Sequence, residues 1–413
     1  MNLKYLIRMP AILISGILAG TIFLWLAFLI PDKLIYEHGA ESVEIFTGEG
    51  LYPFVGNTPA EELDNWTDSL MIHTACYQKE DASALESAVA AYRPVYQDAD
   101  PITSFRMDVK GIDNGMEITS YARYWHGYLV FLRPLLFFMD YQGIRALTNL
   151  GVVFTLLLIT GTLIRQKRYC LILPFLCTAL FLRPLAIAFS IQFSSVYYVM
   201  IFSLFLILVC RNQMEQDGRY LYLFLINGMI TAYLDLLTYP AAALGIPLVF
   251  FLATGKMVNF LEAVKKTIGA FASWAFGYFG IWSGKWLIGS LVLKRNVLAD
   301  AMNQAKLRTV TVTGERVFAR SAVFLRNIKY SFYGILIPAV LILGLFSVYL
   351  LWRHRHRAKQ LVWHMLPYLI LCLLPFAWYA VFANHSMEHV FFTYRLIAIS
   401  VSSWLCMCAA EGS

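Results

Sequence analysis

The sequence predicts an all-α polytopic membrane protein of about ten transmembrane helices, with a mixed extracytoplasmic loop subdomain after the first span. Hydrophobic residues make up 59% of the 413 residues and charged residues 14%, and the mean hydropathy is +0.61. Apolar runs near the roughly 20 residues that cross a bilayer recur along the whole chain. Basic residues gather in short loops between these runs, as the positive-inside rule expects. The net charge of +7 therefore gives no reason to expect nucleic acid as a partner.

The first span and the segment after it set the predicted orientation. Residues 1–30 hold a basic start, with Lys4 and Arg8, followed by an apolar run without a small-residue cleavage site. We interpret this region as a retained signal anchor with a cytoplasmic N-terminus. Residues 31–145, rich in Asp, Glu, Gly and Pro, then form an extracytoplasmic loop, with short helices and a hairpin around residues 102–118.

An interfacial helix is expected at the end of this loop. Residues 128–139 are largely apolar but number only about a dozen, too few to cross a bilayer comfortably, and they include Arg133 and Pro134. Residues 146–291 then hold spans two to seven. A second, basic extracytoplasmic segment covers residues 292–332. Spans eight to ten occupy residues 333–413, which places both termini in the cytoplasm.

Cysteine usage indicates neither disulfides nor a structural zinc site. Only Cys76 of the seven cysteines lies in the first outer loop, so no partner is available to it there. No Cys-x-x-Cys or His-Glu-x-x-His pattern occurs. No metal site and no cofactor is predicted, although a divalent metal stays open.

The stretch Leu63-Asp64-Asn65-Trp66-Thr67-Asp68 carries the candidate catalytic residues. Asp64 is typical of a helix N-cap, and the helix is expected to continue through Ile72. Asp68, four residues later, would share a helical face with Asp64. Two carboxylates one turn apart beside a membrane offer a general base and a neighbour that tunes its pKa. The alternative is a helix start with one capping and one solvated aspartate.

Other polar candidates fall on the predicted outer side. His385 and His389 are four apart and suit either a metal or polar contacts to a ligand, but interfacial histidines are an equal alternative. Arg395 opens the last span, where it either snorkels to the headgroups or binds an anion. Asp235 ends a span and is either a helix terminus or a ligand contact. Few ionisable residues fall near the midplane of a span, which favours an enzyme at the outer interface over an ion-coupled transporter.

The order of parts resembles the GT-C superfamily of integral-membrane glycosyltransferases, which includes protein O-mannosyltransferases and lipid A aminoarabinose transferases. The likeness rests on an acidic residue at the start of a juxtamembrane helix, here Asp64, after the first span. It rests also on an interfacial helix and an arginine-containing turn, here residues 124–139 and Asp140-Tyr141-Gln142-Gly143-Ile144-Arg145. The chain departs from the pattern in having separated acids, and Tyr-Trp-His-Gly before the interfacial helix.

The resemblance implies transfer of a sugar from a polyprenyl-phosphate donor to an extracytoplasmic acceptor: a glycan, a lipid or a cell-wall polymer. It implies Asp64 as general base and Asp68 as its partner or as an acceptor contact, in a bacterial-type plasma membrane. Substrate contacts are then expected from residues of the later outer segments and the turn before the interfacial helix: His126, Asp235, Arg316, Arg320, His385, His389 and Arg395. Among these, the arginines would stabilise the departing phosphate.

Two other functions fit the same layout. A transporter or flippase for lipid-linked saccharides would share the basic outer segment and a lipid groove, but it predicts polar residues along a continuous path through the spans. A non-enzymatic assembly or sensor protein would bind a partner through its outer domain. That reading would leave the aspartates far from the final histidines.

Overall fold

The computed structural model describes residues 3–255, 260–314, 316–333, 336–354 and 358–409. Within these ranges four helices are long and apolar enough to cross a bilayer: Ile7–Ala27, Tyr141–Arg165, Ile191–Val209 and Val390–Ala409. Shorter apolar helices accompany them at Leu129–Phe138, Tyr169–Leu182, Tyr220–Leu234, Ala241–Thr254 and Met365–Val381. The expected all-α membrane protein is confirmed. The count of about ten spans, the sidedness and the position of the termini stay predictions.

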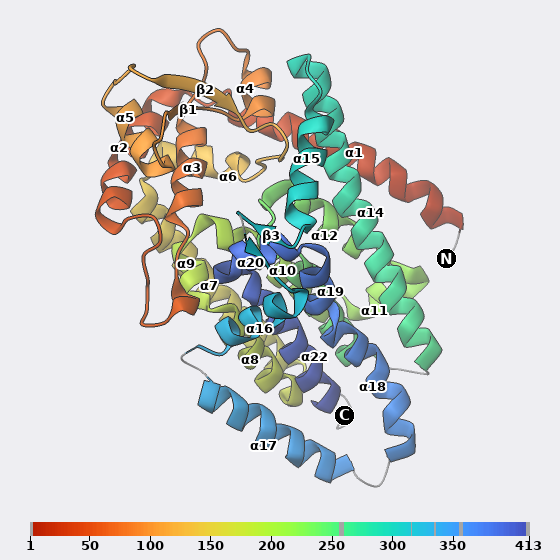
Figure 1. Ribbon diagram of the computed structural model, residues 1–413. Coiled ribbons are helices and arrows are strands. Elements are labelled where there is room, and N and C mark those ends of the chain that lie inside the picture. The colour runs from red at the N-terminus through yellow and green to blue at the C-terminus, as the bar shows by residue number, and fades with distance from the viewer. Residues whose placement is uncertain (1–2, 256–259, 315, 334–335, 355–357, 410–413) are drawn as a thin grey trace.

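The first outer loop, a name we keep for residues 31–145, folds into a small group of helices with one hairpin. Figure 1 shows this group to one side of the longer helices. In chain order it follows α1 (Leu3–Ala27) and consists of α2 (Asp32–Glu49), η1 (Pro59–Glu61), α3 (Asn65–Cys76), α4 (Ala84–Ala90), β1 (Tyr92–Tyr96), α5 (Pro101–Val109), β2 (Met116–Ser120) and α6 (Leu129–Phe138).

The hairpin lies partly outside its predicted range. Strands β1 and β2 pair antiparallel, from Tyr92 opposite Ser120 to Tyr96 opposite Met116, whereas residue 102, the expected start, lies in α5. The reason is local: Asp100 caps α5 by accepting hydrogen bonds from the backbone N–H groups of Ile102 and Thr103, and Pro101 suits a first helical position. The helix therefore interrupts what the sequence indicated as one hairpin.

Helix α6 forms within the range where the sequence predicts an interfacial helix, and its buried arginine explains how this helix is held. Arg133 is fully buried. Its Nε donates to the carbonyl of Ala27 at 2.9 Å and its Nη2 to that of Ile30 at 3.2 Å, while Nη1 donates to the carbonyl of Ala75. The guanidinium thereby satisfies carbonyl groups at the C-terminal ends of both α1 and α3.

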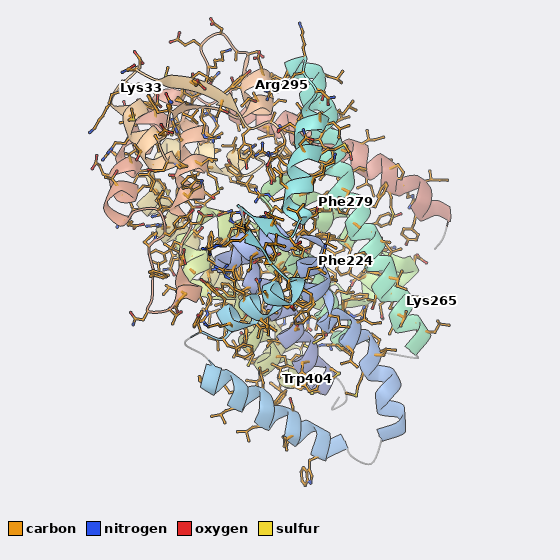
Figure 2. All side chains as sticks on the ribbon, viewed as in Figure 1. Lys33, Phe224, Lys265, Phe279, Arg295 and Trp404 are labelled. Atoms are coloured by element: carbon orange, nitrogen blue, oxygen red, sulfur yellow. The ribbon has the colours of Figure 1, made fainter. Side chains whose placement is uncertain are left out.

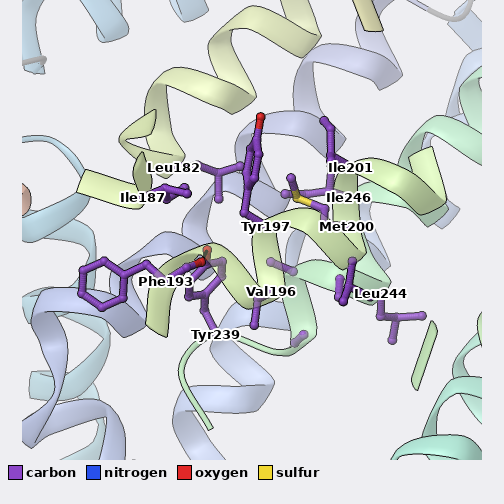
Figure 3. Close-up of a cluster of buried hydrophobic side chains, with 14 of the residues drawn as sticks. Leu182, Ile187, Phe193, Val196, Tyr197, Met200, Ile201, Tyr239, Leu244 and Ile246 are labelled. Carbon is purple, nitrogen blue, oxygen red and sulfur yellow. Dashed lines mark hydrogen bonds between the residues drawn. The ribbon is translucent and has the colours of Figure 1, made fainter. Parts of the chain in front are cut away.

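The central helices pack around α13 (Ala241–Thr254), every residue of which is buried. Figure 3 shows Met200 of α10 (Ile191–Val209) beside Ile246 of α13, and Phe193 of α10 beside Tyr239. The Tyr239 hydroxyl just before α13 donates to the Phe193 carbonyl at 2.5 Å. The surrounding elements are α7 (Tyr141–Arg165), η2 (Tyr169–Leu171), α8 (Ile172–Leu182), α9 (Pro184–Phe189), α11 (Arg211–Glu215), η3 (Gln216–Gly218) and α12 (Tyr220–Leu234).

Helices α12 and α14 (Phe260–Leu293) approach each other closely through glycines. A Cβ added to Gly228 would lie 2.2 Å from the Trp274 carbonyl oxygen, and one added to Gly277 would lie 2.2 Å from the Leu225 carbonyl oxygen. Small residues at such crossings let apolar helices pack backbone to backbone. At 34 residues α14 is about 51 Å long, which exceeds a bilayer core. In Figure 2 Lys265 lies near the start of α14 and Arg295 lies just past its end.

The C-terminal part returns the chain to the first outer loop. It comprises α15 (Val297–Thr309), β3 (Val312–Thr313), β4 (Arg316–Val317), α16 (Arg320–Ser331), α17 (Leu336–His354), α18 (Ala358–Cys372), α19 (Leu374–Val381), α20 (Ala383–Glu388), α21 (Val390–Thr393), η5 (Tyr394–Leu396) and α22 (Ile397–Ala409). We name residues 384–395 the last outer turn. Helix α20 packs against α15, α16 and α19, as can be followed in Figure 1.

Candidate functional site

Asp64 caps α3, as the sequence predicts. The Thr67 backbone N–H donates to Oδ1 at 3.0 Å and the Thr67 hydroxyl donates to Oδ2 at 2.7 Å. The residue is only 3% exposed. Burial raises the pKa of Asp64 to about 7, against the lowering effect of the Thr67 hydrogen bonds and with a further increase from nearby Asp68 and Glu62. A carboxyl group with this pKa exchanges protons near neutral pH.

Asp68 lies next to Asp64 but has a different environment. It is fully buried, and its carboxylate accepts hydrogen bonds from the Tyr141 hydroxyl at 2.5 Å and from the backbone N–H groups of Ile191 and Gln192 at 3.0 and 2.9 Å. The Ser190 hydroxyl adds a contact at 3.3 Å. Asp68 therefore joins α3 to the first residues of α7 and α10, and the first backbone N–H groups of α10 favour a negative charge there. This arrangement indicates a positioning residue for Asp64.

An ion pair that the sequence did not indicate holds the start of α3. Arg145 donates to both carboxylate oxygens of Glu49, at 2.5 and 2.9 Å, and to the Asn65 side-chain oxygen at 3.2 Å. The Asn65 amide in turn donates to Glu49 at 2.9 Å. Arg145 is the arginine of the turn after the interfacial helix, and Glu49, its partner from α2, carries no local sequence signal.

The last outer turn lies against the first outer loop. The Tyr394 hydroxyl donates to the carbonyl of Ala60 at 2.6 Å, and the ring of Phe391 lies 5.6 Å from the ring of Tyr52. Tyr52 is close enough to Asp64 for the aspartate charge to raise the pKa of its hydroxyl, after burial as the main cause. The structure thus brings the last outer turn to the loop that carries Asp64.

Arg395 lies in this contact region as a fully buried guanidinium. Its Nε and Nη1 donate to the carbonyls of Leu182 and Phe391, at 3.0 and 2.9 Å, and it stacks on the ring of Phe193 at 4.2 Å. Its Nη2 forms no hydrogen bond within the described part of the chain. A buried donor without a partner is costly. The arrangement therefore suits a ligand anion.

A second buried arginine, Arg183, has a carboxylate partner, but at a distance longer than that of a hydrogen bond. It is 6% exposed and lies 3.7 Å from Glu61 of the first outer loop. Its Nε also has no hydrogen-bond partner among the described residues. Burial lowers the pKa of Arg183, and the nearby charge of Arg395 lowers it further, so two cationic side chains lie close together here.

The two histidines of the last outer turn, His385 and His389, both contact the same arginine side chain. Nη1 of Arg308 lies 3.2 Å from Nδ1 of His385 and 3.0 Å from Nε2 of His389. An arginine only donates, so both ring nitrogens must accept and both imidazoles are neutral. Burial lowers the pKa of both histidines, that of His389 to about 4. Within the described ranges no group of three His, Cys, Asp or Glu side chains is placed to hold a metal ion.

Asp235 is connected to this pair through the turn after α12. Its carboxylate accepts from the Thr238 backbone N–H at 3.0 Å and from the Thr238 hydroxyl at 2.5 Å, and burial raises its pKa to about 7. Between them, Leu237 has a φ of 71°, a conformation that a non-glycine residue rarely adopts. The Leu237 carbonyl lies 2.6 Å from Nε2 of His385, which brings the Asp235 turn to the last outer turn.

His126 has both ring nitrogens occupied by the protein. Nδ1 lies 2.9 Å from the Tyr128 hydroxyl and Nε2 lies 2.8 Å from the carbonyl of Tyr121. Burial lowers its pKa to about 3, and the charges of Lys285, Arg93 and Arg123 lower it further. His126 also has a positive φ of 55°. These features are those of a residue that shapes the turn before α6.

Arg316 and Arg320 are exposed, in contrast to the buried arginines. Arg320 donates from Nε to the carbonyl of Ala380 at 3.0 Å, which attaches α16 to α19. Arg308, from the second outer segment, contacts the last outer turn, and no sequence pattern distinguishes it from the other basic residues of that segment. The position of Arg308 depends on how α15 folds back, which no local pattern reveals.

An apolar groove lies between α6, α7, α10 and α12, with a cavity volume of about 630 Å³. Tyr128, Ile191 and Leu234 line it next to the buried polar residues, because they adjoin His126, Asp68 and Asp235 respectively. Leu206 and Leu223 line it farther along the same helices. From residue 191 to residue 206 the α10 wall is about 22 Å long, which is enough for a long hydrocarbon chain.

No protein-family model, no curated protein and no solved structure matches this chain.

Proposed function

We propose that this protein is a GT-C-type glycosyltransferase that moves a sugar from a polyprenyl-phosphate donor to an extracytoplasmic glycan, lipid or cell-wall acceptor. The observation that carries the proposal is Asp64: a buried carboxyl group with a pKa of about 7, in a loop that contacts the turn containing the buried Arg395. A base and an anion-binding donor in neighbouring segments are what transfer from a lipid phosphate requires.

In the proposed reaction Asp64 accepts the proton of an acceptor hydroxyl while the hydroxyl oxygen attacks the anomeric carbon. The bond between that carbon and the phosphate oxygen breaks, and the phosphate leaves with the electron pair. Nη2 of Arg395 is the donor available to that phosphate. Because Asp64 is only 3% exposed, substrate binding must open the segment that leads into α3.

The groove supports a lipid-linked donor. Its lining is dominated by apolar side chains of α6, α7, α10 and α12, and hydrocarbon buried there gains free energy in proportion to its area. The groove begins beside residues that adjoin Asp68 and Asp235. A prenyl chain in the groove would therefore hold its phosphate near the buried polar residues.

The test is transfer by Asp64→Asn, with Asp100→Asn as a matched control. Both aspartates cap a helix in an Asp-x-x-Thr sequence, so both variants lose a similar cap. We expect Asp64→Asn to lose about a hundred- to ten-thousand-fold in rate, and Asp100→Asn to keep its activity. The measurement is release of polyprenyl phosphate from radiolabelled lipid-linked sugars by purified protein, with membranes of a deletion strain as acceptor.

The pH profile gives an independent readout. Since the pKa of Asp64 is about 7 and the base must be ionised, the wild-type rate should fall about tenfold per pH unit below that value and level off above it. Near wild-type turnover by Asp64→Asn would refute the assignment. Movement of a lipid-linked saccharide across vesicles without release of polyprenyl phosphate would point to a transporter instead.

A further inference from the structure

A small cleft lies between α14, α15 and the segment before His126, next to the last outer turn. Its cavity volume is about 50 Å³, enough for a few water molecules or for one carboxylate or phosphate group. The lining includes three aromatic side chains, two arginines and one glutamine: Tyr124, Trp282, Trp286, Arg123, Arg308 and Gln304.

The charge in this cleft is incompletely balanced. Arg308 uses Nη1 for both histidines, and within the described residues it forms no ion pair with a carboxylate and no hydrogen bond through Nε or Nη2. Arg123 pairs with Asp300 at 3.3 Å, but that aspartate side chain is 49% exposed and holds the arginine weakly. Two guanidinium groups therefore border the cleft without a strong carboxylate partner, and an anion at its edge could pair with them.

The aromatic side chains provide flat apolar faces around the same opening. Trp282 lies 5.9 Å from Tyr124 and 5.8 Å from Trp286, measured between ring centroids. Trp286 is fixed by its indole N–H, which donates to the carbonyl of Arg123 at 3.0 Å. The indole N–H of Trp282 is buried and has no partner among the described residues. Flat rings beside a few polar donors are typical of a small-ligand site.

We propose that this cleft binds an anionic saccharide, with its carboxylate or phosphate group against Arg308 and Arg123 and its sugar ring over Trp282 and Trp286. The volume of about 50 Å³ is too small for a sugar ring, which places the ring at the aromatic rim and the anionic group at the edge where the two arginines lie. Gln304 is the lining residue suited to a sugar hydroxyl.

The position of the cleft relates this ligand to the proposed reaction. Arg308 contacts both histidines of the last outer turn, and Leu237, which lines the cleft, bonds to His385. The bound saccharide would therefore be the acceptor, or the part of it next to the reacting hydroxyl. This assignment rests on the proposed function, whereas binding of the saccharide does not.

The experiment is calorimetric titration of the full-length protein in lipid nanodiscs. The ligands are methyl glucuronide, the matched neutral methyl glucoside, and inorganic phosphate. We expect the glucuronide to bind about tenfold or more tightly than either of the others, because only it uses both the arginines and the rings. Arg308→Gln and Arg123→Gln should each lose about tenfold in affinity. Arg326→Gln, which changes an exposed arginine of α16, should bind normally.

Three results would overturn the inference. Equal affinity for the glucoside would remove the role of the charge, equal affinity for inorganic phosphate would remove the role of the rings, and loss of binding in Arg326→Gln would place the ligand elsewhere. Trp286→Phe should keep the fold and reduce only saccharide affinity. Titration of Asp64→Asn separates the two proposals, since that variant should bind the glucuronide normally whether or not it transfers sugar.

Discussion

Asp64 and Asp100 cap two helices of the same loop with the same local structure, but their pKa values are shifted in opposite directions from that of an ordinary aspartate. Each accepts a hydrogen bond from the backbone N–H and from the hydroxyl of the threonine three residues later, and the hydroxyl distances are 2.7 and 2.6 Å. Yet the pKa of Asp64 is raised to about 7, while that of Asp100 is lowered. The difference lies in the surroundings of the two caps.

Burial accounts for this difference. Both carboxyl groups are desolvated, but Asp64 is 3% exposed whereas Asp100 stays partly in contact with solvent. At Asp100 the hydrogen bonds from Thr103 and Ile102 outweigh the partial burial, and at Asp64 burial outweighs the bonds from Thr67. Asp235, a third aspartate with a threonine three residues later, is buried and has a pKa of about 7 as well. The motif decides where a turn or helix begins, and packing decides whether its carboxyl group is chemically useful.

Replacing Asp68 should remove the packing that makes Asp64 different from Asp100. In Asp68→Asn an amide N–H₂ group would face the N–H groups of Ile191 and Gln192 and the Tyr141 hydroxyl. We expect a loss of about 3 kcal/mol in the free energy of unfolding, measured by denaturation in detergent. A loss of about 1 kcal/mol or less, the usual cost of a lost helix cap, would mean that the Asp68 contacts contribute little to stability.

The pH dependence of stability should separate the two caps. A folded-state pKa above the ordinary 3.8 means that the folded protein holds the proton more tightly, so stability falls as the pH rises from about 3.8 to about 7. Asp64→Asn removes this loss, and its stability relative to wild type should improve by about 2.6 kcal/mol between pH 5 and pH 8. Asp100→Asn should show no such change, because the lowered pKa of Asp100 places its titration below pH 3.8. Thermal unfolding at several pH values measures both, and parallel curves for the two variants would contradict the comparison.

The smallest expected effect concerns the capping threonines. Thr67→Val and Thr103→Val each remove one hydroxyl hydrogen bond to a carboxylate, which should cost about 1 kcal/mol of stability in each case. Only Thr67→Val should also move the pH midpoint of the reaction upward, because the lost bond favoured the ionised form of Asp64. A downward or unchanged midpoint would argue against Asp64 as the titrating group.

The sequence was sufficient where the signal is local. The cap at Asp64, a helix at residues 129–138 and the apolar helices all follow from residue type and spacing. It failed at the hairpin, because the Asp100-Pro101 helix start lies inside the apparent strand region. The capping Asp100 followed by Pro101 is itself a local signal for a helix start.

The remainder of the candidate site depends on contacts between distant segments. Asp68 appeared as a neighbour for Asp64 on one helical face, but the N-terminus of α10 binds it instead. Arg308 was one basic residue of many in its segment until α15 brought it to the histidines. The apolar groove consists of residues that are individually ordinary for membrane helices. Neither periodicity nor composition predicts such contacts between distant segments.

Helix α3 is fastened at both ends, and this limits how the proposed chemistry reaches its substrate. Arg133 connects the Ala75 carbonyl to the end of α1, while Asp68 connects the other end of α3 to the starts of α7 and α10. The helix is therefore anchored to apolar helices at both of its ends. In the proposed reaction the acceptor must then come to Asp64, because the helix that Asp64 caps is held in place by these contacts.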